Sequence, residues 1–428
     1  MISLKKLWRD KRGNALVIAG AALPLVVGSA GLASDTIQWA LWKRQLQRAA
    51  DSAAIAGVYD RIYYDGATTN VPTAVDYDLG KNNHSKRTIL AGYPQIAYPT
   101  GTNWEVPVRV RLAVQKKLGF SSLFLPNPPT IIAEATAATV KTGVYCVVSL
   151  INNNTTGIKM TGTAKVDLGC GMITNSTSLT AAVAGGNAQV YATPIAAVGD
   201  IKDSDNWKNN PELLPFTVKQ DDPFNKVKPD TSMCPTSPVK LDVQWNKAMP
   251  TLPAAGHTTC YSGIEINGTV TLPAGTYVID GGSLSFGPKA VVTCNGCTFV
   301  LTNQSTSSTA TIGGIDINST AELHLFAPKT GCTLGNTGCY DGILMYQDRR
   351  ATLGGKQLIN GKSGSELSGA MYFPRQELKI DGSSVISFSC AQFVAYVVEF
   401  AGTNDTVNTC TGGYGDKVIM GKHVRLVG

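Results

Sequence analysis

Ten cysteines are the residues of this 428-residue sequence whose number and placement point most directly to chemistry. All of them lie beyond residue 140. An even number of cysteines confined to one part of a chain predicts disulfides formed in an oxidising compartment such as the periplasm. Spacing alone leaves the connectivity open. The simplest hypothesis joins nearest neighbours: Cys146 with Cys170, Cys234 with Cys260, Cys294 with Cys297, Cys332 with Cys339, and Cys390 with Cys410.

The same cysteines have a metal-binding alternative, because Cys294-Asn-Gly-Cys297 has the spacing of a zinc ligand pair. The possible partners Cys332 and Cys339 are separated by six residues, and no histidine follows at zinc-finger spacing. A catalytic redox pair would lie near a βαβ pattern, which this region lacks. His257 stands close to Cys260, but two such residues do not make a metal site. We therefore predict no metal and no cofactor.

Scattered aspartates are the candidates for a polysaccharide-cleaving site, which needs two carboxyl groups at a fixed separation. The Asn-Thr-Asp, Gly-Asp-Asp and Gly-His-Gly motifs expected of polygalacturonases do not occur. Isolated aspartates at the corners of a β structure are usually turn residues, and "YQDRR" (346–350) predicts a surface ion pair. The candidates are Asp280, Asp316, Asp341, Asp348, Asp381 and Asp405.

Other catalytic motifs are incomplete. The "GKS" at 361–363 lacks the phosphate-loop glycine five residues earlier, where Lys356 stands. No His-Glu-x-x-His occurs, and His324 is expected to be a strand residue that faces outward or is satisfied in the core. The four histidines are scattered: His84, His257, His324 and His423. We predict no catalytic residues and a protein that is not an enzyme.

Composition excludes some partners and favours one fold class. The net charge is +7, but much of it lies near the N-terminus and no continuous basic stripe follows, which argues against nucleic-acid binding. Charged residues make up only 16% of the chain, and Gly, Ser, Thr and Asn are abundant, which favours an all-β body with many turns. The length predicts two folded domains.

An uncharged run, "ALVIAGAALPLVVGSAGLAS" (15–34), follows a basic tail at residues 1–14. As a helix it spans about 30 Å, the thickness of a bilayer core. Basic flanks stay cytoplasmic, so we predict a single-pass inner-membrane helix with the rest of the chain in the periplasm. A signal peptide cleaved near Gly31-Leu32-Ala33 is one alternative. The others are a prepilin leader, to which the match is poor, and a buried core helix.

After residue 34 the sequence predicts that the helix continues, with one stripe of apolar and small residues. The Ala/Gly end of this stripe lets another backbone approach closely. It packs either on the strands that follow, or against copies of itself or other pilus-type helices. The helix-packing residues are Trp39, Trp42, Leu46, Ala49, Ala50, Ala53 and Gly57.

Residues 60–100 read as loop-rich, and two strands follow. "WEVPVRVRLAVQKKL" (104–118) alternates apolar and polar residues, "TIIAEATAATVKTG" (130–143) supplies a second strand, and a turn-rich apolar link joins them. A helix with a small antiparallel sheet predicts that residues 35–143 form an α+β neck shaped like a pilin.

The N-terminal segment contains a set of short motifs: Arg12-Gly13-Asn14, Pro24, Gly31-Leu32-Ala33-Ser34-Asp35 and "LQRAADSAA" (46–54). In these motifs it resembles the TadE/TadG-like proteins of bacterial Flp (tight-adherence) pilus assembly. It implies a single-span envelope protein whose partners are inner-membrane proteins of the pilus or secretion machinery. Some TadG-like relatives carry a von Willebrand A metal site, but the nearest string here, Asp381-Gly-Ser-Ser-Val385, lacks its second serine.

Residues 144–428 contain short apolar strands that recur every 20–27 residues: "CTFVLT" (297–302), "ELHLFA" (322–327), "GILMYQ" (342–347), "GAMYFP" (369–374) and "AQFVAY" (391–396). This spacing predicts a disulfide-braced parallel β-solenoid in which each coil lies on the one before it. Asn318, Asp381 and Gly382 are expected to take left-handed corners. "LPAGTYVIDGG" (272–282) resembles the first coil of right-handed parallel β-helix proteins such as pectate lyases. A β-sandwich is the alternative.

These observations predict a non-enzymatic, membrane-anchored envelope protein of a Flp/Tad-type system. Its β-helix would offer Ser, Thr and Asn side chains to a protein partner or to a glycan or surface ligand. One alternative is a membrane-tethered β-helix polysaccharide hydrolase or lyase. Another is a secreted adhesin released by signal cleavage.

Overall fold

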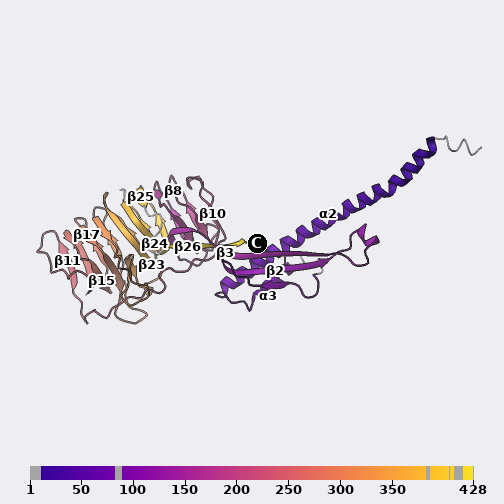
Figure 1. The fold of residues 1–428 in the computed structure, drawn as a ribbon. Helices are drawn as coiled ribbons and strands as arrows, with labels where there is room; N and C mark the ends of the chain where they lie inside the picture. The colour runs from indigo at the N-terminus through magenta and orange to yellow at the C-terminus, as the bar shows by residue number, and fades with distance from the viewer. Residues whose placement is uncertain (1–10, 82–88, 382–385, 404, 409–417, 428) are drawn as a thin grey trace, which may run out of the picture. The chain divides into compact units, whose positions relative to one another are not determined.

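A computed structural model describes residues 11–81, 89–381, 386–403, 405–408 and 418–427 (Figure 1). The chain divides into two compact units. Unit 1 comprises Met1–Val140 together with Val424–Gly428, and unit 2 comprises Lys141–His423. The last five residues thus group with the N-terminal unit, although the sequence alone places them in the C-terminal domain.

One long helix, α2 (Lys11–Tyr63), begins unit 1. It is long and apolar enough to cross a membrane, and its most apolar stretch is not buried in the protein. Pro24 lies inside the helix and does not end it. Among the residues that the structure describes, one helix is therefore suited to anchoring the chain in a membrane.

Three antiparallel strands accompany the helix: β1 (Gln95–Ala97), β2 (Glu105–Gln115) and β3 (Thr130–Ser149). β2 pairs with both of the others. Its alternating sequence buries Val108 and Val110 and leaves Arg109 and Arg111 partly exposed. Between β2 and β3 lies a single 3₁₀ turn, η2 (Ser121–Leu123). Helix and sheet make unit 1 an α+β unit.

The expectation of loops throughout residues 60–100 is wrong, because helix α3 (Val71–Lys81) lies there and packs on α2. Val71, Val75 and Leu79 recur every four residues and are buried. Only three apolar positions carry this signal, and the sequence around them is rich in Gly, Asn and Thr. Tertiary packing rather than propensity stabilises such a short helix.

Unit 2 is built from short parallel strands; every pairing among the described strands β4–β25 is parallel. The strands are β4 (Ile158–Met160), β5 (Lys165–Asp167), β6 (Gly171–Thr174), β7 (Ala182–Ala184), β8 (Gln189–Tyr191), β9 (Ile195–Ala197), β10 (Leu213–Leu214), β11 (Lys240–Gln244), β12 (His257–Tyr261), β13 (Gly263–Asn267), β14 (Thr269–Thr271), β15 (Gly275–Asp280), β16 (Leu284–Phe286), β17 (Val291–Asn295), β18 (Cys297–Thr302), β19 (Ile315–Ile317), β20 (Glu322–Phe326), β21 (Ile343–Gln347), β22 (Lys356–Ile359), β23 (Glu366–Ile380), β24 (Ile386–Phe400) and β25 (Asp405–Asn408), with β26 (Ile419–Leu426) ending the chain.

The strands form three ladders, because most strands pair with the strand three places further along the chain. β12, β15, β18 and β21 belong to the first ladder, β13, β16, β19 and β22 to the second, and β14, β17 and β20 to the third. The long strands β23 and β24 take part in all three. Such a repeat is compatible with a β-helix.

The two halves of unit 2 join in the middle of the stack. β3 pairs with β6 on one side and with β24 on the other. From β3 the chain forms a first series of coils that leads away from the junction and ends at β10. A second series begins with β11 and β12 and leads back to the junction through β15 and β18 to β24. In Figure 1 the yellow strands β24 and β25 accordingly lie between β15 and β8. The expectation that each coil lies on the one before it is therefore wrong at this junction.

One row of inward side chains runs through the first ladder and across the junction. Its members are in register on successive strands and are all buried: Ile195, Met172, Val147, Phe393, Met371, Met345, Phe299 and Tyr277. Burying each such side chain stabilises the fold by about 1.5–3 kcal/mol. The row makes the interiors of the two halves one core.

The sequence assigns one strand to the wrong ladder. "ELHLFA" (322–327) was expected to be equivalent to "CTFVLT" and "GILMYQ", but β20 pairs with β17 and β23, whereas β18 pairs with β15 and β21. The chain between β18 and β21 contains two long connections, 303–314 and 327–342. One sequence repeat counted onward from β18 therefore ends at β20, which belongs to a different ladder.

Two of the three expected left-handed corner residues are also wrong. Asn318 and Asp381 do not have a positive φ, and Gly382 lies outside the described residues. Asn318 instead accepts a hydrogen bond from the Thr320 backbone N–H through its side-chain oxygen, at 3.0 Å. This Asx turn closes the corner with ordinary backbone angles.

Candidate functional site

The predicted packing stripe of α2 is covered by unit 1 itself. Its small and apolar members from position 46 onward are buried: Leu46, Ala49, Ala50, Ala53 and Gly57. A Cβ atom at Gly57 would lie 2.9 Å from Val108 Cγ1 on β2 and 3.1 Å from Val71 Cγ1 on α3. The stripe therefore packs on the chain's own sheet and on α3. Trp39 keeps 43% of its surface exposed, and Trp42 is half-buried.

Asp35 binds the link between β2 and β3. It is 3% exposed, and one carboxylate oxygen accepts the Phe120 backbone N–H at 3.0 Å. The other oxygen accepts the backbone N–H and the hydroxyl of Ser121. A single carboxylate thus satisfies three donors at the start of η2 and fixes the link on the helix.

Gly31 supports the same link one helical turn earlier. A Cβ atom there would lie 2.3 Å from a carbon of the Phe120 ring, so only glycine leaves room for the ring against the helix. Residues four apart on a helix share a face, and Gly31 and Asp35 both contact the link. The Gly31-Leu32-Ala33-Ser34-Asp35 motif therefore has a structural role that the sequence alone does not reveal.

Polar contacts continue this docking along α2. The Lys116 Nζ lies 4.4 Å from the centre of the Trp42 ring. The Lys43 ammonium donates to the Ile132 carbonyl, and Gln47 donates to the Glu134 carbonyl at 2.8 Å. These side-chain bonds to the backbone of β3 hold the sheet at one position along the helix.

Four of the expected cysteine pairs lie at disulfide distance in the structure. Their Cα atoms are separated by 5.9 Å in Cys146–Cys170, 5.0 Å in Cys234–Cys260, and 6.0 Å in both Cys294–Cys297 and Cys332–Cys339. Cys390 is disulfide-bonded as well, and its expected partner Cys410 lies outside the described residues. All described pairs lie in unit 2.

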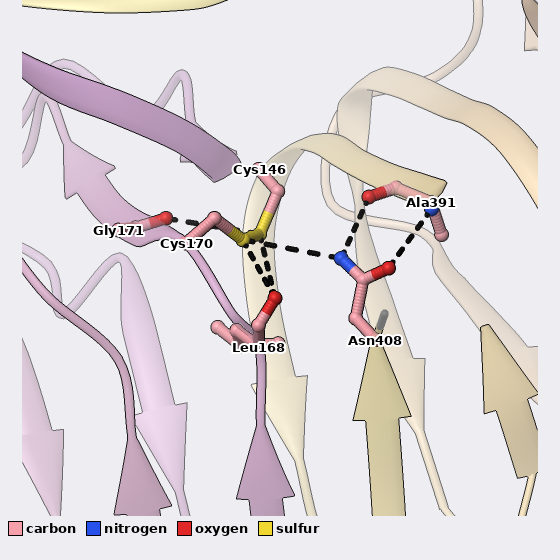
Figure 2. Close-up of a disulfide and its surroundings, with 6 residues drawn as sticks. All are labelled: Cys146, Leu168, Cys170, Gly171, Ala391 and Asn408. Atoms are coloured by element: carbon pink, nitrogen blue, oxygen red, sulfur yellow. Dashed lines mark hydrogen bonds between the residues drawn. A yellow bond between two sulfur atoms is a disulfide. The ribbon is translucent and has the colours of Figure 1, made fainter. Parts of the chain in front are cut away.

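The Cys146–Cys170 bridge lies at the junction of the two halves (Figure 2). Its Cys170 sulfur is 3.0 Å from the Leu168 carbonyl oxygen. The buried Asn408 amide lies 3.9 Å from the same sulfur. Asn408 also donates to the Ala391 carbonyl and accepts the Ala391 N–H, both at 3.1 Å. The bridge and this amide tie β24 and β25 to the first coil.

No group of three His, Cys, Asp or Glu side chains suited to a metal ion occurs among the described residues. Cys260 is bonded to Cys234, so it cannot act with His257 as a thiolate ligand. His324 is half-buried and lies 3.4 Å from Glu322, and His423 lies 3.4 Å from the Thr217 hydroxyl. His84 is outside the described residues.

The aspartates considered as candidates for a polysaccharide-cleaving site are dispersed, and most of those described accept hydrogen bonds from nearby residues. Asp280 accepts bonds from the Gln304 backbone and side chain at 2.7 and 2.8 Å. Asp341 accepts the Gly331 backbone N–H at 3.2 Å, and Asp316 is exposed on β19. The Asp405 side chain is outside the described part of the chain. These contacts are those of turn and loop residues.

The sequence "YQDRR" was expected to form an ion pair at the surface. It does form an ion pair, but the carboxylate of that pair, Asp348, is buried. Asp348 is 4% exposed and accepts bonds from Arg350 at 2.8 Å and from the Thr302 hydroxyl at 2.7 Å. Burial raises the pKa of Asp348, but the hydrogen bonds from Arg350 and Thr302 outweigh it and hold the pKa below its usual value. Arg350 also donates to the Asn303 carbonyl, so the pair closes a corner after β18.

The other arginine of the same motif, Arg349, holds the long segment 215–239 that links the two halves of unit 2. Arg349 lies 3.3 Å from Asp222 and donates to the Val227 carbonyl at 2.8 Å. The Tyr372 hydroxyl donates to Asp222 at 2.6 Å, and the Tyr346 hydroxyl donates to Val227 at 3.0 Å. Burial and the nearby Asp222 charge raise the pKa of Tyr372. The sequence gives no sign of this network, since its partners are more than 100 residues apart.

A charged cluster that the sequence did not suggest lies on the second ladder. Lys356 pairs with Glu377 at 2.7 Å, and Lys379 lies 3.8 Å from Glu399 and also pairs with Asp381. Burial and the neighbouring Glu377 raise the pKa of Glu399. Burial also raises the pKa of Glu377, but Lys356 outweighs it, so that this pKa is lowered. Acids and lysines alternate across neighbouring strands and largely neutralise one another.

The family comparison concerns α2, the helix that carries Gly31 and Asp35. Residues 13–60 match the Tad family, described as putative Flp pilus-assembly TadE/G-like. The match covers nearly all of α2 and stops before α3. No curated protein and no solved structure matches the chain. The resemblance of the N-terminal segment to TadE/TadG-like proteins is thereby confirmed for these residues.

Proposed function

We propose that the protein is a non-enzymatic, single-pass component of a Flp/Tad-type pilus-assembly or tight-adherence system. The observation that carries this proposal is the coincidence of the family match with α2, an apolar helix whose motif residues hold the adjacent sheet. The N-terminus would lie in the cytoplasm, and the chain after residue 34 would lie in the periplasm. Basic residues before the apolar run favour this orientation, and so do the disulfide pairs of unit 2.

Residues 35–143 would act as a pilin-like neck that contacts inner-membrane proteins of the machinery. Unit 2 would be a right-handed parallel β-helix that presents a binding face. Three parallel ladders with a shared interior support this reading of unit 2. The exposed part of the α2 surface before residue 46, including Trp39, supports a contact made by the helix. The ligand of the β-helix face would be a protein or a glycan.

The decisive experiment is purification of the C-terminally tagged protein in mild detergent from its native cells. We expect pilins or secretion-platform proteins to co-purify with it. A matched control replaces residues 1–34 by a cleavable signal peptide, and this variant should lose those partners. Full-length protein recovered in the soluble cytoplasm with reduced cysteines would overturn the proposal. An N-terminal epitope tag missing from the mature protein would instead favour the secreted adhesin.

The charged cluster on the second ladder supplies the one observation that favours a tethered polysaccharide hydrolase or lyase. Glu377 and Glu399 interact and have pKa values shifted in opposite directions, as an acid–base pair requires. Each, however, is paired with a lysine. We expect purified protein to release no oligosaccharide from envelope polysaccharides. Release that is lost in Glu399→Gln would establish the enzymatic function.

A further inference from the structure

The link between β2 and β3 exposes three consecutive large apolar side chains. Leu123, Phe124 and Leu125 are exposed to 75%, 70% and 51%. The ring of Phe124 is supported by Phe120, with 5.3 Å between ring centres. Clustered apolar side chains of this size on a surface mark a site of interaction. We call residues 120–125 the apolar tip.

The position of the apolar tip along α2 is fixed by the contacts of Asp35 and Gly31. Asp35 binds Phe120 and Ser121, and the Phe120 ring lies against Gly31. Gly31 belongs to the predicted membrane-spanning run 15–34. The tip is therefore held beside the end of that run rather than beyond it.

Residues typical of a membrane interface lie further along the same helix. Trp39 and Trp42 follow the apolar run, and Lys116 lies over the Trp42 ring. Tryptophan and lysine are enriched at the level of the lipid headgroups. From Trp42 back to Gly31 the helix descends about 16 Å at 1.5 Å per residue. The chain from Lys116 to Phe120 follows this descent, from the level of the tryptophans to the level of the apolar run.

We propose that the apolar tip inserts into the outer leaflet of the membrane that α2 spans, with Lys116 and Lys117 at the headgroups. A bilayer is the occupant that the structure favours, because the apolar surface of α2 beside the tip is exposed as well, at Leu32 and Val27. The protein then has two membrane contacts, a spanning helix and a loop. This inference rests on the proposed single-span anchor.

The experiment places single cysteines in the full-length protein and labels them with an environment-sensitive fluorophore. No cysteine in the described residues is free, so none of these competes with an added cysteine for the label. Phe124→Cys tests the tip, Val26→Cys tests the anchor, and Tyr63→Cys at the far end of α2 is the aqueous control. The proteins are reconstituted in phosphatidylethanolamine/phosphatidylglycerol vesicles containing a spin-labelled lipid that quenches fluorescence.

We expect strong quenching at positions 26 and 124 and little at position 63. Absence of quenching at 26 would refute the anchor. Quenching at 26 without quenching at 124 would refute the membrane-inserted tip alone. Protection of 124 from an aqueous quencher without lipid quenching would assign the tip to a second protein copy and overturn the inference. Leu123→Cys repeats the measurement in case Phe124→Cys folds poorly.

Asp35 provides a second readout in the Phe124→Cys background. Asp35→Asn replaces one accepting oxygen by a donor, so it should release the link and reduce lipid quenching at 124 at least twofold. Ser121→Ala removes one of three donors and should have a smaller effect. Unchanged quenching in Asp35→Asn would show that this carboxylate does not set the position of the tip.

Discussion

The helix of unit 1 buries mainly small side chains, whereas the first ladder of unit 2 buries a row of large ones. The helix of unit 1 presents alanines and one glycine, Gly57, and brings the backbone of α2 close to β2 and α3. Unit 2 stacks phenylalanine, tyrosine and methionine in rows, and all described disulfide pairs lie there. Unit 1 should therefore be sensitive to added volume, and unit 2 to lost volume and to reduction.

The strongest test of this difference removes volume from the row that crosses the junction of unit 2. Phe393 is fully buried between Val147 and Met371 in register. Phe393→Ala should lower the free energy of unfolding of unit 2 by about 3–5 kcal/mol. Hydrogen exchange read by mass spectrometry should show faster exchange in unit 2 peptides and unchanged exchange in α3. Leu179→Ala, at an exposed position, is the control.

Removing the junction disulfide should have the next largest effect. Replacing both Cys146 and Cys170 by serine opens a link between residues 24 apart and should cost about 2–4 kcal/mol. The thermal midpoint of unit 2, measured by circular dichroism, should fall accordingly. The pair Cys332–Cys339 closes a shorter loop, and its removal should cost less. Equal costs for the two pairs would contradict a role for loop length.

Added volume in unit 1 should have a moderate effect. Gly57→Val adds a side chain whose Cβ alone would lie 2.9 Å from Val108 Cγ1, and overpacking of this kind costs about 1–3 kcal/mol. Urea unfolding followed by hydrogen exchange in β2 peptides measures it. Gly80→Ala is the matched control, because nothing lies within 4 Å of a Cβ atom at Gly80. It should leave stability unchanged or raise it slightly.

The smallest effect is expected from the titration of Asp348. Because its folded pKa lies below the unfolded value, its contribution to stability is present above the unfolded pKa of about 3.9 and is lost as the pH falls through the folded pKa. The thermal unfolding midpoint of unit 2, measured from pH 6 down to pH 2, should start to decrease once the pH is below about 4. In Asp348→Asn this part of the decline should be absent; an identical decline would exclude Asp348 as its source.

Features carried by neighbouring residues were predictable. The apolar run, the alternation in β2 and the recurrent strands of β18, β21, β23 and β24 all have local periodicities, and each corresponds to an element of the structure. Helix α3 was not predicted, because three apolar positions give only a weak helical signal. β20 was placed in the wrong ladder because the lengths of surface connections are not set by the strand repeat.

The sequence by itself determined which segments are apolar, which alternate and how many cysteines can pair, because these depend on residue type and short spacing. Tertiary structure alone decided that β24 lies on β3, that Arg349 and Tyr372 hold the segment around Asp222, and that Asp35 holds Ser121 across 86 positions. Parallel pairing and such polar contacts join residues far apart in the chain. Their partners are selected by the packing of the whole domain rather than by local sequence.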